Sequence, residues 1–299
     1  MLAVEGRTPR RKVRPHREGE VVNHPDELHD HDRGLSHDLP TLLNRRRALG
    51  LLGAAGLALA GCSQTESGPT PADAGTPPPP GSVADQPTMA VGKGQIPEET
   101  AGPYPADGSN GVSVLTESGI VRSDITTSFG TASAVATGVP LTIKLKVLDT
   151  KGGSNPLHGA TVYVWHCDNA GRYSMYSSGV TEENYLRGVQ EADRAGEVTF
   201  TSIYPAAYSG RWPHIHFEVY PSLVKATTAT GRLRTSQLAL PEDICRRVYA
   251  TDGYPGSDSN LDDMSLQTDP VFGDGYSLQL ANVDGSVGGG YTATLHVPV

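Results

Sequence analysis

The chain has 299 residues, with 24 basic and 33 acidic side chains, so its formal net charge at neutral pH is −9. Proteins that bind nucleic acid neutralise phosphates with a basic surface, so this charge argues against a nucleic-acid partner. Hydrophobic residues make up only 37%, while 35 Gly and 23 Pro supply close to a fifth of the chain. This composition indicates that part of the chain lies outside any folded core.

The N-terminal part follows the order of an export signal. Residues 1–43 are rich in Arg and His and lack apolar periodicity, which indicates a disordered leader or a start placed too early. Residues 44–61 contain three consecutive arginines and then an apolar run that ends in small residues before Cys62, as in a signal peptide. The arginines resemble a twin-arginine signal, and Leu-Ala-Gly-Cys resembles a bacterial lipobox, in which Cys62 becomes the lipidated N-terminus. The route, twin-arginine or general secretion, stays open.

Residues 62–94 form a tract rich in Ser, Thr, Pro, Gly and Ala, which is typical of a flexible linker behind a lipid anchor. No other segment is apolar enough to span a membrane, so we expect membrane contact only through the anchor. Residues 62–299 contain 14 basic and 25 acidic side chains, a net charge of −11. The sequence therefore predicts an exported, extracytoplasmic protein that is anchored to the cell membrane by lipid.

Residues 95–299 carry the pattern of a single β-rich domain. Alternating or continuous apolar stretches, separated by Gly, Asn, Asp and Pro, predict strands at 140–148, 160–165, 196–203, 214–220, 276–283 and 291–297. We expect the last two strands to pair, and one short helix around 241–248. Six or more strands in about 200 residues predict an all-β fold, an antiparallel β-sandwich.

Three cysteines require separate interpretations. If Cys62 is lipidated, Cys167 and Cys245 are left in an oxidising compartment. They form either one disulfide or two buried free thiols, and the sequence leaves both alternatives open. A zinc site built on cysteine needs more cysteines or a C-x-x-C spacing, and the chain has neither.

The clearest chemical motif is the His-x-His pair of His214 and His216. Residues two apart in a strand face the same side, so both imidazoles can bind one metal ion. Glu218 lies on the same face and could complete a site of two histidines and one carboxylate.

Two tyrosines on predicted turns accompany this pair. Tyr173 follows a Gly-Arg turn, and Tyr208 lies six residues before His214. Phenolate is a strongly donating ligand with an ordinary pKa of about 10, so only a strong Lewis acid keeps it deprotonated. Two His with two Tyr therefore favour ferric iron over zinc or ferrous iron.

Together these motifs resemble the intradiol ring-cleavage dioxygenases, a family of non-haem iron(III) enzymes that cleave catechol and protocatechuate. The resemblance covers about residues 96–299 and is strongest to compact, secreted members. The matching motifs, in the family's order, are Gly102-Pro103-Tyr104, Trp165 with Gly171-Arg172-Tyr173, Leu186-Arg187-Gly188, Pro205-x-x-Tyr208, Arg211-x-x-His214-x-His216 and Ser236-Gln237-Leu238.

The resemblance implies a β-sandwich that holds Fe(III) through Tyr173, Tyr208, His214 and His216. Tyr173 would be the equatorial tyrosine ligand. Tyr208 would be the axial one, which leaves the metal when substrate binds and acts as a base.

The same resemblance implies the substrate contacts. Arg211 and Gln237 would line the pocket and stabilise negative charge on the ring. Tyr104 would lie at the substrate entrance, and Trp165 would pack near the iron. The implied partners are a small aromatic diol of the catechol type and O2, and the product is a muconate-type diacid.

Three departures from the family bear on these expectations. Ala206 stands where many relatives have Gly, the spacing from Tyr208 to His214 is short, and the helical N-terminal segment that catechol-type relatives use to dimerise is missing. The identity of the catechol and the oligomeric state therefore stay open.

Two other functions are compatible with the sequence. One is a non-catalytic lipoprotein whose β-sandwich binds carbohydrate or protein, since fold alone does not fix function. It predicts that Tyr173, Tyr208, His214 and His216 do not converge. The other is a ferrous oxygenase of the two-His-one-carboxylate type, with Glu218 as its third ligand.

Overall fold

The computed structural model describes residues 94–228 and 230–299. The predicted leader, signal peptide, lipidated Cys62 and nearly all of the linker lie outside the described residues and stay predictions. Within the described part, no helix is long and apolar enough to cross a membrane.

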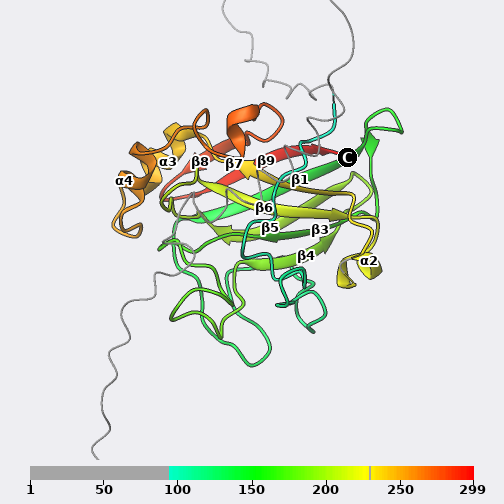
Figure 1. Ribbon diagram of the computed structural model, residues 1–299, viewed down its shortest axis with the longest axis horizontal. Coiled ribbons are helices and arrows are strands. Elements are labelled where there is room, and N and C mark those ends of the chain that lie inside the picture. Colours follow the sequence, from blue (N-terminus) through cyan, green and yellow to red (C-terminus); the bar gives the residue numbers. More distant parts are fainter. Residues whose placement is uncertain (1–93, 229) are drawn as a thin grey trace, which may run out of the picture.

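Two β-sheets form the body of the molecule (Figure 1). The first has the strand order β2-β1-β9-β8, with β5 also paired to β1, and the second has the order β4-β3-β6-β7. The strands of the first sheet are β1 (Pro140–Asp149), β2 (Asn155–Pro156), β5 (Glu197–Ile203), β8 (Asn282–Ser286) and β9 (Gly290–Pro298). Those of the second are β3 (Thr161–Trp165), β4 (Arg187–Glu191), β6 (His214–Tyr220) and β7 (Arg234–Ala239). The predicted all-β sandwich is confirmed.

The pairing departs from the prediction at one place. Six of the seven strand pairs are antiparallel, but β1 and β9 run parallel, with Leu141 opposite Tyr291 and Val147 opposite Val297, within the described residues. The last strand of the domain therefore lies beside the first one at the centre of its sheet. The sandwich is mainly, not purely, antiparallel.

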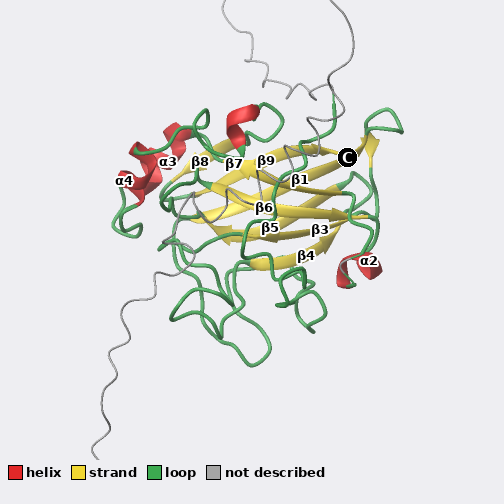
Figure 2. Cartoon of the chain, in the orientation of Figure 1, coloured by secondary structure: helices red, strands yellow, loops and turns green. Residues whose placement is uncertain are grey.

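Among residues 94–228 and 230–299, four short helical segments lie at the margins of the sheets: α2 (Leu223–Thr227), α3 (Glu242–Tyr249), α4 (Ser257–Asp262) and the 3-10 helix η2 (Phe272–Asp274) (Figure 2). The predicted helix corresponds to α3, which begins directly after Pro241. Acidic residues occupy its first turn and basic residues its last, the arrangement that the helix dipole favours.

One predicted strand is wrong. Residues 277–279 form a turn, because the carbonyl of Tyr276 accepts hydrogen bonds from the N–H groups of Gln279 and Leu280, and Leu280 makes only an isolated bridge to Ala239. Strand β8 begins only at Asn282, and it pairs with β9 as expected. The polar strands β4 and β7 were not predicted, because tertiary contacts rather than an apolar alternation bury them.

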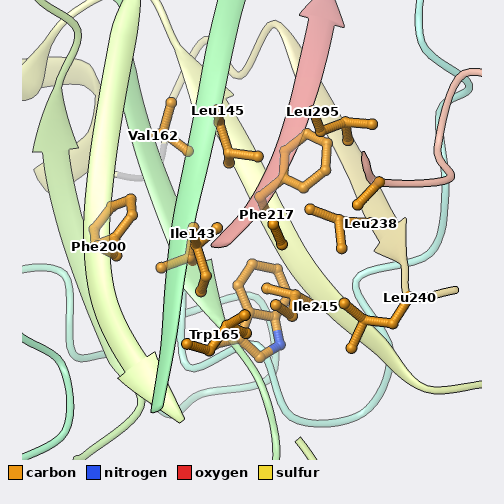
Figure 3. Close-up of a cluster of buried hydrophobic side chains, with 14 of the residues drawn as sticks. Ile143, Leu145, Val162, Trp165, Phe200, Ile215, Phe217, Leu238, Leu240 and Leu295 are labelled. Atoms are coloured by element: carbon orange, nitrogen blue, oxygen red, sulfur yellow. The ribbon is translucent and has the colours of Figure 1, made fainter. Parts of the chain in front are cut away.

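The hydrophobic core lies between the sheets. Figure 3 shows Ile143 and Leu145 of β1 close to Ile215 and Phe217 of β6, and all four side chains are buried. Burial alternates along β1, as expected for a strand with one face in the core and one toward water. In contrast, all seven residues of β6 are buried. The outer face of the second sheet is therefore covered as well, and the cover consists of loops.

Candidate metal centre

The four residues predicted as metal ligands come together on the covered outer face of β6. The hydroxyl oxygens of Tyr173 and Tyr208 lie 3.3 Å apart, and the Tyr208 oxygen lies 3.2 Å from Nε2 of His214. Nε2 of His214 lies 3.1 Å from Nε2 of His216. Donors bound about 2.1 Å from one metal, at right angles, stand about 3.0 Å apart, so this spacing suits a shared ion. We call these four residues the tetrad.

Strand geometry and two loops bring the tetrad together. The histidines are two apart in β6 and share a face, while Tyr173 follows β3 and Tyr208 follows β5. The loops approach closely at Gly171, where φ is +79° and an added Cβ would lie 3.3 Å from the Cβ of Tyr208. Any other residue at 171 would strain this turn and press on Tyr208.

The two imidazoles are oriented in different ways. Nδ1 of His214 donates to the carbonyl of Trp212, which leaves the lone pair of Nε2 facing the tetrad. Nδ1 of His216 is buried without a hydrogen-bond partner in the described part of the chain. Its ring instead stacks on Trp165, with centroids 4.9 Å apart and an interplanar angle of 8°. An added Cβ at Gly102 would lie 3.3 Å from the same ring.

Burial favours the neutral forms of Tyr173, His214 and His216. Burial, with the nearby charge of Arg211, lowers the pKa of His214 to about 3, and burial lowers the pKa of His216 well below its usual value. Both imidazoles therefore present lone pairs at neutral pH. Burial, with the neighbouring Tyr208, raises the pKa of Tyr173 well above its usual value. A strongly Lewis-acidic cation is the partner that would make a phenolate favourable here.

The donor set fits ferric iron better than the alternative that uses Glu218. Among residues 94–228 and 230–299, no three of His, Cys, Asp and Glu are placed to hold a metal. The carboxylate of Glu218 accepts from Tyr220 at 2.6 Å and pairs with Arg232. It is engaged there instead of completing a site with the two histidines. The alternative of a non-catalytic binding lipoprotein predicts that these four residues do not converge, and their convergence contradicts it.

Arg211 and Gln237, the predicted pocket residues, contact each other next to the tetrad. Gln237 lies opposite His216 in the pairing of β7 with β6, and its Oε1 accepts from Nη2 of Arg211 at 2.6 Å. Its amide nitrogen donates to the carbonyl of Thr100 at 2.9 Å. The guanidinium is 3% exposed, so its position is fixed.

Sequence reasoning missed Asp269, which orients Arg211 from the opposite side. Its carboxylate accepts from Nε of Arg211 at 3.0 Å and from the backbone N–H of Trp212 at 2.7 Å. The N–H groups of Val271 and Phe272 also donate to it. No sequence motif marks Asp269, because it belongs to a loop more than fifty residues after His214.

Glu99 is a second buried carboxyl that the sequence did not mark. Burial, with the nearby charge of Asp274, raises its pKa to about 8. The side-chain amide of Gln279 lies 3.4 Å from it.

The two predicted aromatic contacts are both beside the tetrad. The ring centroid of Tyr104 is 4.9 Å from that of Tyr173, which places the Tyr104 loop against a ligand candidate. Trp165 is fully buried between the rings of His216 and Tyr163. In this structure Trp165 therefore supports His216.

Cys167 and Cys245 are both buried free thiols. The thiol of Cys167 lies 3.6 Å from the carbonyl of Ala206, and Sγ of Cys245 lies 3.2 Å from the hydroxyl of Tyr204. The disulfide alternative is not what the structure contains.

Comparison with known proteins finds similarity to dioxygenases. Residues 122–230 match the family model described as dioxygenase. The chain is 37% identical over 75 residues to catechol 1,2-dioxygenase of Candida albicans, covering 25% of this chain and 24% of that protein. It is 31% identical over 143 residues to chlorocatechol 1,2-dioxygenase of Rhodococcus opacus, covering 42% and 49%. The chain thus spans about a quarter and about half the length of these two relatives.

A solved structure matches a larger share of the chain. The intradiol ring-cleavage dioxygenase of Tetranychus urticae superimposes with a TM-score of 0.53 at 25% identity, over 69% of this chain and 94% of that one. These sequence matches and this superposition together support the intradiol ring-cleavage dioxygenase family for the chain. As in the resemblance drawn from the sequence, the intradiol dioxygenase match covers the β-sandwich that carries the tetrad.

Proposed function

We propose that this intradiol dioxygenase uses Fe(III) to open the ring of a catechol-type aromatic between its two hydroxylated carbons, with O2 as co-substrate. The observation that carries the proposal is the convergence of two phenol oxygens and two imidazole nitrogens at 3.1–3.3 Å. Tyr173, Tyr208, His214 and His216 would hold the ion. Bound iron would supply the Lewis acidity that draws protons from a catechol and the electron-accepting capacity that lets its ring react with O2.

Tyr208 is the tetrad member best placed to act as a base. The other three side chains are at most 3% exposed, whereas Tyr208 is only partly buried. It also lies in a loop instead of a strand, so it can move without disturbing the sheet. In the proposed reaction its phenolate accepts a proton from a substrate hydroxyl.

Arg211 supplies fixed positive charge beside the reacting ring. Asp269 and Gln237 hold its guanidinium from two sides, so the charge is oriented before substrate arrives. A preorganised cation lowers the barrier of a step in which negative charge develops, because no reorganisation is needed during the step. Gln237 offers its own dipole at the same place.

The first test is optical and respirometric. We expect the Fe(III)-loaded protein to show a visible phenolate-to-iron charge-transfer band and to take up O2 with at least one catechol, giving a diacid product. His216→Ala should lose the band and the uptake. Tyr276→Phe, which changes a tyrosine outside the tetrad, should keep both. A colourless iron-loaded wild type, or no uptake across a panel of catechols, would contradict the proposal.

We also propose that the protein is exported and held at the membrane by lipid on Cys62. The support is the order of arginines, apolar run and Leu-Ala-Gly-Cys in residues 45–62. Labelled palmitate should enter the wild type and not Cys62→Ser, which should be released from membranes. Equal labelling of the two proteins would refute this.

A further inference from the structure

The Leu186-Arg187-Gly188 motif has no part in the tetrad or in the contacts of Arg211. It lies at the start of β4, where Arg187 is the pairing partner of Trp165. The Arg187 side chain is 1% exposed, which is rare for an arginine, and its guanidinium lies 5.4 Å from the ring centroid of Tyr176. Its role must therefore be sought in what it touches inside the protein.

The Arg187 guanidinium joins two loops of the site to each other. Its Nε donates to Oγ of Ser174 at 3.1 Å and its Nη2 to the Ser174 carbonyl at 2.9 Å. Its Nη1 donates to the carbonyl of Pro105 at 3.2 Å. Ser174 directly follows Tyr173, and Pro105 directly follows Tyr104. One side chain thus holds the residue next to a tetrad member and the residue next to the entrance tyrosine.

The strand beneath these loops completes the arrangement. The Tyr163 hydroxyl of β3 accepts from Nη1 of Arg187 at 3.1 Å and donates to the Pro105 carbonyl at 2.8 Å. Tyr163 stacks on Trp165, which stacks on His216. A continuous set of contacts therefore runs from Arg187 to two tetrad members, Tyr173 through Ser174 and His216 through the aromatic stack.

The two neighbours of Arg187 also have constrained positions. Leu186 has a φ of +57°, a conformation that is unfavourable for a leucine. An added Cβ at Gly188 would lie 2.4 Å from a methyl group of Ile125, so only glycine fits there. A backbone this constrained on both sides fixes where the Arg187 side chain leaves the strand.

The acceptors of Arg187 are neutral. Two carbonyls and two hydroxyls receive its N–H groups, and within the described residues none of its hydrogen bonds or ion pairs is to a carboxylate. Burying a charge with neutral partners is unfavourable compared with an apolar residue of the same size. The planar fork of five donors can reach both loops at once, and a lysine ammonium cannot reproduce that geometry.

We propose that Arg187 is a positioning residue of the metal centre: by binding Ser174 and Pro105 it sets the place of Tyr173 in the tetrad and of Tyr104 beside it. The proposal rests on the proposed function in so far as Tyr173 is an iron ligand. It gives the Leu-Arg-Gly motif a physical purpose in the assembly of the site.

The test compares Arg187→Met, which removes both the planar guanidinium donors and the charge, with Arg187→Lys, which keeps only the charge. Leu295→Ala is the control, since it weakens the buried core of the other sheet without touching either loop. In the metal-free proteins, hydrogen exchange should rise in residues 104–107 and 173–177 for both Arg187 variants and not for the control. Iron affinity should fall about 10- to 100-fold, as for residues that orient metal ligands. The charge-transfer band should shift only in the Arg187 variants.

The outcomes separate the two proposals. Arg187→Lys matching the wild type in exchange and affinity would overturn the positioning role, because charge alone would then suffice. Equal changes in the control and in Arg187→Met would overturn it too, because general destabilisation would explain them. If the wild type binds no iron but both Arg187 variants still loosen the two loops, loop positioning stands and the proposed function fails. Should Arg187→Met not fold, Ser174→Ala tests the same contact.

Discussion

The two sheets of this sandwich differ in how far their outer faces are buried. In the first sheet, β1 places apolar side chains in the core and Thr142, Lys144 and Lys146 on the opposite face, where burial is lower. In the second sheet, β6 is buried on both faces, and the face away from the core carries His214, His216 and Glu218. One sheet has water on its outer side, and the other has loops.

The difference shows how the molecule forms a dry polar site. Polar groups in a water-covered sheet face would be solvated and their interactions weak. Loops that cover the second sheet exclude water from the histidines and bring Tyr173 and Tyr208 to them from outside the strands. The sandwich supplies rigid placement on one side, and the loops supply the remaining donors.

The largest expected effect is a difference in kcat between variants on the outer faces of the two sheets. Tyr208→Phe, in the loop over the second sheet, should lower kcat about 100- to 10,000-fold, because the proposed proton acceptor is lost. Thr142→Ala, on the outer face of the first sheet, should leave kcat unchanged. Steady-state O2 uptake measures both. Comparable losses in the two variants would remove the functional distinction between the sheets.

The second prediction concerns the core that the sheets share. Phe217→Ala should lower the free energy of unfolding by about 3–5 kcal/mol, because a fully buried aromatic ring leaves a cavity. Thr142→Ala should change it by less than about 0.5 kcal/mol. Urea unfolding followed by fluorescence gives both values. A loss below about 1 kcal/mol at Phe217 would mean that the sheets pack loosely there.

The third prediction tests the loop support of Arg211. Burial alone would raise the pKa of Asp269, but the charge of Arg211 and the backbone N–H donors hold it below its usual value. Asp269→Asn should lower kcat/KM roughly 10- to 100-fold, since a hydrogen bond to a charged group contributes about 1.5–3 kcal/mol. The amount of iron bound per molecule of folded protein should stay the same. An unchanged kcat/KM would show that Gln237 alone suffices to orient Arg211.

The fourth prediction concerns the pH dependence of stability. The pKa of Glu99, raised to about 8, means that the folded state binds a proton more tightly than the unfolded chain, whose Glu ionises near pH 4.5. This site's contribution to stability is therefore greatest below pH 4.5, falls as pH rises, and is fully lost above about pH 8. Asp274, Asp269 and Arg211 are the charged groups that act on it.

Glu99→Gln should flatten that dependence. The melting temperature of the variant, relative to that of the wild type, should therefore rise as the pH increases from 5 to 8. A series of thermal melts at matched ionic strength measures the difference. A constant offset between the two proteins across this range would mean that Glu99 titrates as an ordinary carboxyl.

The sequence predicted the parts of this molecule that have a local signature. Alternation in residues 140–148 and the His-x-His spacing at 214–216 are local patterns, and both correspond to what the structure contains. The apolar alternation at 276–281 did not produce a strand, because hydrogen bonds to the carbonyl of Tyr276 close a turn there. The roles of Asp269 and Glu99 had no local signature, because Asp269 binds Arg211 from a distant part of the chain, and the burial of Glu99 depends on how distant segments pack.

The sequence by itself determined which residue types are present, their spacing within strands and the family that they resemble. Tertiary structure alone decided that β9 runs parallel beside β1, that the thiols stay apart, and that loops from distant parts of the chain close over one sheet face. The physical reason is that the alternation of apolar residues in a strand depends only on residues that are close together in the chain. Donor distances near 3 Å in the tetrad depend instead on how distant segments pack.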